Sequence, residues 1–250
     1  IRKALMTKEL TLSFPQKNGF FFGLIGTDME RVKVDDKWVS RSRGWDTYFW
    51  GNSNRNPYTG DPKNSPFHIL DMSWTANIML EWYNELEKDQ RLLDYAKSYA
   101  DSLLTLQYEN GFFPSWLDIN TLRPLEYLTL SPEVSMSVSF LLTLFDITKN
   151  EKYRQSALKA MNAIIKNIIF QGRWEDFETY WSCSRVGSYY WVGNKLWRNN
   201  MYKQNNFLMF WTAQALLKSY HETKDRIYLK LGQRTLDELL MTQASWQPYF

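Results

Sequence analysis

The sequence of 250 residues contains one cysteine, two histidines and no long apolar run. Because Cys183 is the only cysteine, an internal disulfide is excluded, and cysteine content does not indicate a redox compartment. His68 and His221 each lack a second histidine or a cysteine at ligand spacing, which argues against a metal site. The longest apolar run, around 164–170, is interrupted by polar residues and falls short of the roughly 20 residues of a membrane span.

Cofactor and nucleic-acid signatures are also missing from this chain. It has no glycine-rich phosphate loop, no Gly-x-Ser-x-Gly elbow and no dinucleotide fingerprint, so we expect no cofactor. The net charge of +3 is spread over separate arginines, whereas nucleic-acid-binding proteins usually show a clustered basic face. At 44% hydrophobic and 23% charged residues, the composition is that of a globular protein with a core.

Aromatic residues are abundant, at 17% of the chain with 12 Trp and 15 Tyr, and many fall between the helical stretches. Large aromatics in loops commonly line a groove or an interface. Sugar rings are one fitting ligand, because their C–H faces stack on aromatic planes while their hydroxyl groups need polar side chains. Two such groups are Trp45/Tyr48/Phe49/Trp50 and Tyr189/Tyr190/Trp191/Trp197.

A two-helix unit recurs three times along the chain. Residues 74–85 align with residues 211–222 with Trp, Thr, Ala, Leu, Tyr and Glu in register, and residues 136–145 keep the pattern. The first helix of each unit is apolar on nearly all sides and the second is amphipathic. We therefore expect buried first helices inside half-solvated second helices.

The repeat predicts an all-α fold of antiparallel helical hairpins, with the first helices in an inner ring and the second helices in an outer one. The predicted hairpins span 66–107, 131–170 and 200–243, with Trp74, Met136 and Trp211 at equivalent inner positions. Ser65-Pro66 and Ser131-Pro132 place a capping residue before a proline at expected helix starts.

The regions outside the hairpins are expected to be loop-rich. Residues 1–12 resemble the end of a helix, and residues 29–64 show no helical period and form a long loop of a kind that is commonly functional. We expect one domain over 1–250, with an irregular part at 1–64 and three hairpins at 65–250.

The chain begins at Ile1 and ends in an aromatic loop of the kind that elsewhere precedes another helix. We therefore expect it to be a piece of a longer protein, whose remaining hairpins or domains would be its partners. Apolar surface at its ends should then promote association.

Two acids share one position of the repeat. Asp71 precedes Trp74 by three residues and Glu133 precedes Met136 by three, since 133 − 71 = 136 − 74 = 62. Paired carboxylates across a cleft can cleave a glycosidic bond, one protonating the leaving oxygen and the other activating water or stabilising the cation. Acids in a first helical turn are also favoured by the helix dipole alone.

A denser group of acids and aromatics follows the glycine at position 172. Alternation in an extended segment would place one set of these side chains on each side, and which set packs and which meets a ligand is left open. The group comprises Trp174, Glu175, Asp176, Glu178, Tyr180 and Trp181.

A third candidate segment, residues 41–52, places an acid between aromatics and beside two arginines. Arg41 and Arg43 could hold an acidic sugar through bidentate contacts, with Asp46 between Trp45 and Trp50. An interdomain loop is an equal alternative for this segment.

Together, the hairpins and the loop motifs Asn18-Gly19-Phe20-Phe21, Asn110-Gly111-Phe112-Phe113, Trp174-Glu175-Asp176 and Trp45-Asp46-Thr47 resemble the six-hairpin (α/α) toroid superfamily of glycoside hydrolases and polysaccharide lyases. The resemblance covers about residues 65–250, and three hairpins are visible where six would close the ring. It implies carbohydrate chemistry in a funnel at one end of the barrel, often on uronate-containing glycans. An extracellular or periplasmic location would suit such substrates.

The leading hypothesis is a glycoside hydrolase acting on an oligo- or polysaccharide with two carboxylates, among which Asp46 and Glu178 are also possible. Asp176 is the first choice for the proton donor, with Asp71 or Glu133 as its partner. The catalytic candidates are Asp176, Asp71, Glu133 and Glu175, and the substrate-binding candidates are Arg43, Trp45, Asp46, Trp50, Trp116, Trp174, Glu178, Tyr180 and Trp181.

Two alternatives remain. A polysaccharide lyase would depend more on Tyr180, His68 and Arg43, which could remove a proton beside a uronate. A non-catalytic glycan-binding or scaffold module would need the loop aromatics alone. A terpene cyclase with a similar fold is disfavoured because no Asp-x-Asp-Asp motif is present.

Overall fold

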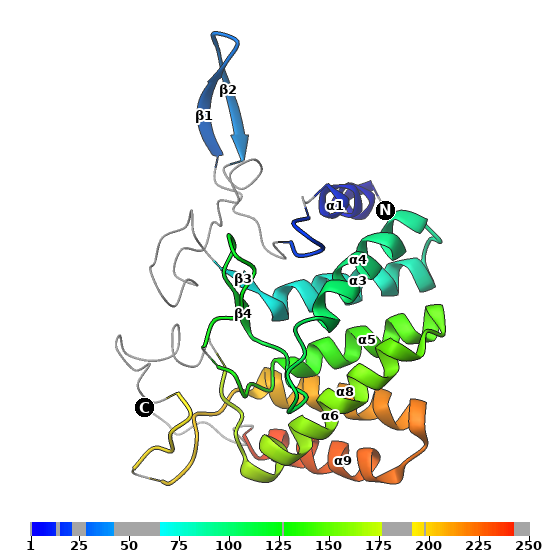
Figure 1. Ribbon diagram of the computed structural model, residues 1–250, viewed down its shortest axis with the longest axis vertical. Coiled ribbons are helices and arrows are strands. Elements are labelled where there is room, and N and C mark those ends of the chain that lie inside the picture. Colours follow the sequence, from blue (N-terminus) through cyan, green and yellow to red (C-terminus); the bar gives the residue numbers. More distant parts are fainter. Residues whose placement is uncertain are drawn as a thin grey trace, which may run out of the picture. The chain divides into compact units, whose positions relative to one another are not determined.

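The computed structural model describes residues 2–13, 16–21, 29–42, 66–126, 128–176, 192–197 and 199–242 (Figure 1). Their contacts form two compact units, which are described separately. The first is Ile1–Leu106 with Pro114–Tyr127, and the second is Gln107–Phe113 with Leu128–Phe250. A single domain over 1–250 therefore stays a prediction. None of the helices in the described ranges has the length and apolar character needed to cross a membrane.

The first unit is built on an antiparallel pair of helices, α3 (Ile69–Glu85) and α4 (Gln90–Leu104). A short antiparallel ladder of β3 (Phe67–His68) and β4 (Trp116–Leu117) stands at the start of α3. Its core is aromatic: the Phe21 ring meets the Tyr95 and Tyr99 rings edge-on, at centroid distances of 5.0 and 5.5 Å.

The Asn18-Gly19 turn anchors this aromatic core to α4. Both residues have positive φ, 49° and 82°, and the Ser102 hydroxyl donates to the Asn18 carbonyl at 2.7 Å. A Cβ atom on Gly19 would lie 2.5 Å from the Ser98 carbonyl oxygen. Only glycine fits this approach without displacing the helix.

Helix α1 (Arg2–Leu12) confirms the helix expected over residues 1–12 and is tied to the first hairpin by charge. The buried Lys8 ammonium donates to Glu87 at 2.7 Å and to Asp89 at 3.0 Å, and these hydrogen bonds raise the pKa of Lys8. Asp89 also caps α4 by accepting from the Arg91 amide at 3.1 Å. The hydrogen bond from the Arg91 side chain leads the effects that lower the pKa of Asp89.

Residues 29–42 differ from the long irregular loop that was expected. They form an antiparallel hairpin of β1 (Met29–Val34) and β2 (Lys37–Ser42), with Val34 opposite Lys37. Asp35 and Asp36 form its two-residue turn with φ of 47° and 62°. Positive φ at both positions is the type I′ geometry, whose twist matches that of the strands.

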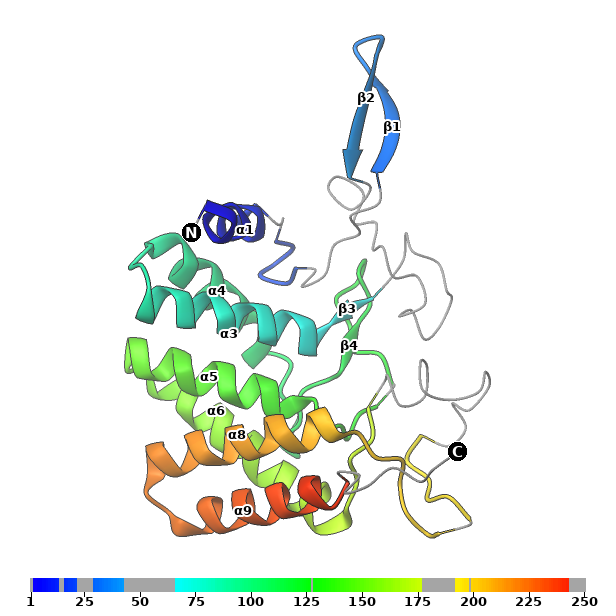
Figure 2. The same cartoon turned by 180° about the vertical axis from the view of Figure 1, so that it is seen from behind.

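The second unit contains two hairpins: α5 (Val134–Thr148) with α6 (Glu151–Asn167), and α8 (Asn206–Thr223) with α9 (Arg226–Met241). A short 3-10 turn, η3 (Ile169–Gln171), follows α6. Helix α8 packs on α5, and Figure 2 shows their amino ends on the same side. Helix α5 is buried almost all round and α9 buries only one stripe, as expected for first and second helices. The first helices α3 and α8 differ from the expectation, because Trp74, predicted at an inner position, and Phe210 are each 44% exposed.

The three predicted hairpins are confirmed, although each first helix begins later than predicted. Helix α5 begins at Val134 rather than at residue 131, and α8 begins at Asn206 rather than at residue 200. Helix α3 begins at Ile69 rather than at residue 66, because 67–68 pair with β4. The Ser131 hydroxyl accepts from the Glu133 amide at 3.2 Å and so caps the turn that leads into α5, as predicted. Ser65 lies outside the described residues.

The turns of the two hairpins in the second unit are copies of one another. Residues 148–150 (Thr-Lys-Asn) and 223–225 (Thr-Lys-Asp) share an offset of 75, and the lysines have φ of 55° and 57°. The final residue of each turn caps the next helix. The Lys218 ammonium donates to the Thr143 hydroxyl at 2.6 Å, and 218 − 143 is also 75. Helix α8 therefore lies along α5 in the register of the repeat.

The left-handed turn lysines give a stability prediction. Lys224→Gly should raise the free energy of unfolding by about 0.5–1 kcal/mol, because glycine avoids the steric cost of positive φ. The measurement is urea denaturation of the purified chain. The control Lys230→Gly, in the interior of α9, should lower stability by roughly 1 kcal/mol, and stabilisation there as well would refute the explanation.

A carboxylate at the end of α8 links it to the neighbouring hairpin. Burial, followed by the hydrogen bond and charge of Asp146, raises the pKa of Glu222. The charges of Lys149 and Arg154 lower the pKa and only partly offset these effects. The Arg154 Nε atom lies 4.0 Å from the Glu222 carboxylate. The folded state therefore binds a proton at Glu222 more tightly than the unfolded chain does.

This raised pKa predicts a pH dependence. The stability that protonated Glu222 provides is present below its unfolded pKa and is lost as pH rises through its folded pKa. Glu222→Gln should therefore raise Tm at pH 7 and change it little at pH 4. The control Glu151→Gln, also beside Arg154 at 3.3 Å but exposed, should not raise Tm at pH 7. Equal gains at both pH values would contradict the assignment.

Candidate functional site

The described candidates fall into three places. Asp71 and Trp116 lie in the first unit, and Glu133 and the segment 173–176 lie in the second. Seven candidates lie outside the described residues: Arg43, Trp45, Asp46, Trp50, Glu178, Tyr180 and Trp181.

Asp176 is held at the amino end of α8. The Asn205 side chain caps that helix by accepting from the Phe207 amide at 2.8 Å, and its amide nitrogen donates to the Asp176 carboxylate at 2.6 Å. The Asn205 backbone amide also donates to the Trp174 carbonyl at 2.8 Å. Asp176 is 4% exposed. The positive end of a helix favours a negatively charged side chain at this place.

Glu175 is fully buried, and its side chain contacts two separate segments of the chain. Its carboxylate pairs with the Arg173 guanidinium and accepts from the Gly193 amide at 3.1 and 3.2 Å. Arg173 in turn lies over the Tyr202 ring, 5.4 Å from its centroid. A buried charge needs such partners to offset its lost hydration. Glu175 therefore connects residues 173–175 with residues 192–193 and, through Arg173, with Tyr202. We call these residues, together with Asp176 and Asn205, the rim cluster.

Trp174 and Trp116 have no exposed surface, so the expectation that they offer stacking faces to a sugar does not hold in the described structure. The Trp174 indole donates to the Glu238 carboxylate of α9 at 2.9 Å. Trp116 stacks on His68, with ring centroids 4.0 Å apart and planes at 9°. Both rings pack in the core, where large aromatics contribute most of their burial energy.

Asp71 lies in the first turn of α3, close to a histidine side chain. The His68 Nδ1 atom is 3.1 Å from its carboxylate, and both side chains are buried. The spacing of three residues would have predicted this pair once a helical turn was assumed. The pair is not evident from the sequence alone, in which His68 suggests only a metal ligand or a base.

Glu133 starts the helix next to α8 and is 3% exposed. Because α5 and α8 run side by side in one direction, Glu133 and Asp176 both stand at the amino ends of neighbouring helices (Figure 2). In the third repeat the matching position is Leu208, since 208 − 133 is 75. At the start of α8 the acid is instead Asp176, which belongs to the preceding loop and accepts a hydrogen bond from Asn205.

Asn205 and Gly193 were missed as parts of this site. Asn205 is one of four helix-capping Asp or Asn residues that begin α4, α6, α8 and α9, a signal that the sequence does contain. Gly193 has φ of 76°, which its sequence position does not reveal. Within the described ranges, no group of three or more His, Cys, Asp or Glu side chains is placed to hold a metal ion.

No protein-family model matches the sequence, and no curated protein matches it. A solved family 76 glycoside hydrolase from a bovine Bacteroides thetaiotaomicron strain is similar at a TM-score of 0.51 and 16% identity, over 71% of this chain and 36% of that one. A GH76 α-mannanase from Bacteroides thetaiotaomicron is similar at 0.47 and 11%, over 69% and 40%. A polysaccharide lyase is similar at 0.42 and 14%, over 74% and 29%.

The match at a TM-score of 0.51 shows that the described hairpins have the fold of part of an (α/α) toroid, as the resemblance implied. The solved structure that matches at this score is a glycoside hydrolase. The chain spans 36 to 40% of the length of the two family 76 structures.

The burial of Trp174 gives a prediction that separates packing from ligand binding. Trp174→Ala should lower the free energy of unfolding by about 3–5 kcal/mol, the usual cost of deleting a buried tryptophan. Trp174→Phe, which keeps most of the ring and loses the donor to Glu238, should cost less. Chemical denaturation measures both. If the alanine variant kept normal stability but lost oligosaccharide binding, Trp174 would be a ligand-binding residue and not a core residue.

Proposed function

We propose that this chain supplies part of a carbohydrate-active enzyme that hydrolyses a glycosidic bond of an oligo- or polysaccharide at the amino ends of α5 and α8. The observation that carries the proposal is the presence of two buried carboxylates, Glu133 and Asp176, at the starts of neighbouring helices that run in the same direction. Most glycoside hydrolases use a pair of Asp or Glu carboxylates to cleave the glycosidic bond.

The surroundings of the two acids support different roles. Asp176, hydrogen-bonded by Asn205 at a helix amino end, suits the ionised group that activates water or stabilises an oxocarbenium-like state. We assign proton donation to Glu133, which begins the neighbouring helix of the same unit.

Glu175 supports the site in this proposal rather than reacting. Its carboxylate is occupied by Arg173 and by the Gly193 amide, so its role is to hold the rim cluster in place. The separation of the two reacting carboxylates would then decide the stereochemistry. About 5–5.5 Å favours a retaining mechanism and about 6.5–9.5 Å an inverting one.

The proposal is tested with conservative variants of the two acids. Asp176→Asn and Glu133→Gln should lower turnover by about 10²–10⁴-fold, the usual contribution of a positioned proton-transfer group, while Tm changes little. The matched control is Asp237→Asn, at an exposed position of α9, which should keep full activity. Release of reducing sugar is measured from a neutral mannan and from a uronate-containing glycan, with the protein that carries this chain.

Each other outcome of this experiment is informative. Full activity in both acid variants would refute the assignment of the acids. An unsaturated uronate product would indicate a lyase instead of a hydrolase. Saturable glycan binding by calorimetry without any product would indicate a binding module.

A further inference from the structure

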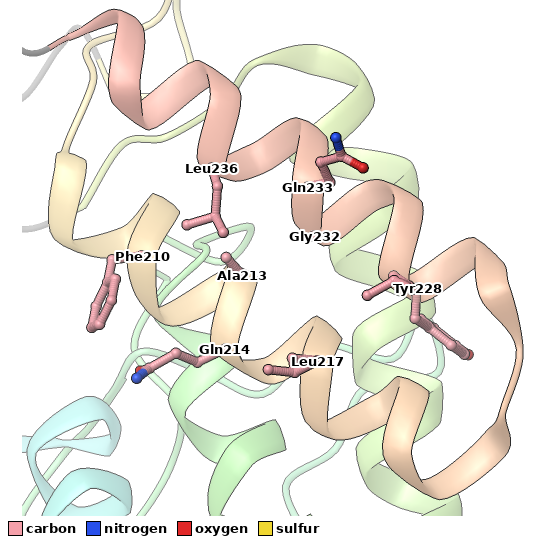
Figure 3. A pocket seen from close by; sticks show the side chains of 9 residues that line it. Phe210, Ala213, Gln214, Leu217, Tyr228, Gly232, Gln233 and Leu236 are labelled. Carbon is pink, nitrogen blue, oxygen red and sulfur yellow. The ribbon is translucent and has the colours of Figure 1, made fainter.

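The groove between α8 and α9 has a volume of about 360 Å³ and is lined mainly by apolar residues (Figure 3). In it Leu236 of α9 and Ala213 of α8 point toward each other. A glycan needs polar or charged side chains at the edges of its rings as well as an apolar surface beneath them, so this groove suits a glycan poorly. The β1–β2 hairpin of the first unit offers both kinds of group.

The β1–β2 hairpin (Figure 1) carries an exposed tryptophan beside two exposed cations, Arg31 and Lys33. Trp38 is 62% exposed, whereas tryptophan is a highly buried residue type on average. The Arg31 guanidinium lies over its ring, 5.9 Å from the centroid, which is the distance of a cation–π contact. The indole is therefore held at the surface by contact with a charge.

The strand register places these three residues on one face of the hairpin. Lys33 lies directly opposite Trp38, and Arg31 is two positions before Lys33 in β1, so both cations belong to the same alternating set. Of the three acids in the hairpin, Glu30 belongs to the other set and the remaining two form the turn. We call Arg31, Lys33 and Trp38 the hairpin face.

Asp36 of the turn meets one of the two cations. The Lys33 ammonium lies 2.7 Å from its carboxylate, and both side chains are exposed. An ion pair this exposed contributes little free energy, because water and salt screen it. Lys33 can therefore exchange Asp36 for the carboxylate of a ligand.

We propose that the hairpin face binds an acidic glycan, whose uronate carboxylates pair with Arg31 and Lys33 while a sugar ring stacks on Trp38. Charge complementarity supports this occupant, because a uronate chain offers carboxylates beside apolar C–H groups, and a guanidinium binds a carboxylate in bidentate geometry. The choice of a glycan among anionic partners rests on the proposed function. The hairpin face is a second site, separate from Glu133 and Asp176, and it holds the glycan without reacting with it.

Other occupants match the hairpin face less well. A neutral glycan would stack on Trp38 and leave both cations unused. Nucleic acids usually meet a larger clustered basic surface, and anionic membranes attract segments with about four to eight basic residues. These partners are therefore alternatives that the experiment must distinguish.

The test measures binding of a galacturonate hexasaccharide and a mannose hexasaccharide to the 250-residue chain by calorimetry. Trp38→Ala and Arg31→Gln should each weaken binding of the acidic sugar by about tenfold, the size of one stacking or charge-assisted contact. The matched control is Lys88→Gln in the same unit, which removes an exposed cation 4.6 Å from the Tyr83 ring centroid. It should leave the affinity unchanged.

A second pair of variants keeps the test decisive if the first two disturb the hairpin. Asp36→Asn retains a residue type that tolerates the positive φ of the turn and releases Lys33, so it should tighten binding of the acidic sugar by about two- to fivefold. The control Asp35→Asn removes the same charge from the same turn but not the carboxylate that meets Lys33. It should tighten binding less.

The proposal requires both the loss in Trp38→Ala and the gain in Asp36→Asn, and any other combination overturns it. Equal affinity for the neutral sugar overturns it as well. Tighter binding of a DNA duplex or of vesicles containing anionic lipid would assign the hairpin face to that partner instead.

Turnover in the same variants separates this proposal from the proposed function. With the protein that carries this chain, Trp38→Ala should keep turnover of a short neutral glycan, whereas Asp176→Asn should lose turnover and keep binding of the galacturonate hexasaccharide. Full turnover in Asp176→Asn would refute the assignment of the acids and leave the binding result at the hairpin face intact.

Discussion

The Asn205 side chain is the contact on which the arrangement of the candidate site depends. The side-chain amide makes two hydrogen bonds: its oxygen accepts from the Phe207 amide in the first turn of α8, and its nitrogen donates to the Asp176 carboxylate. The backbone amide of Asn205 also donates to the Trp174 carbonyl. Because the same residue begins the helix and holds the acid, the position of Asp176 follows from where α8 starts. A shift of that start would move the carboxylate relative to Glu133.

Three buried carboxylates around this fold are stabilised in three different ways. Glu175 is paired with an arginine and a backbone amide, Asp176 with an asparagine, and Asp71 with a histidine. Of these partners, Arg173 carries a fixed positive charge, and its ion pair with Glu175 lies within the rim cluster.

The helical part of the fold could be predicted from the sequence, because apolar residues at helical spacing report directly on packing. The start of α3 could not, because the pairing of 67–68 with 116–117 joins residues far apart in the chain. The β1–β2 hairpin was missed because its turn is Asp35-Asp36 rather than the Asn-Gly or Asp-Gly that usually marks such turns. The burial of Trp116 and Trp174 was missed because composition counts aromatics between helices without showing what surrounds them.

The copied Thr-Lys-Asn and Thr-Lys-Asp turns have a consequence for how such a protein can change. They have the same length and the same left-handed lysine, so both hairpins of the second unit close with the same turn at that end. The connections at the other end, residues 105–133 and 168–205, differ in length although α5 and α8 remain in register. The second unit therefore accommodates connections of different length at the end where Glu133 and Asp176 lie, while its helices keep their register.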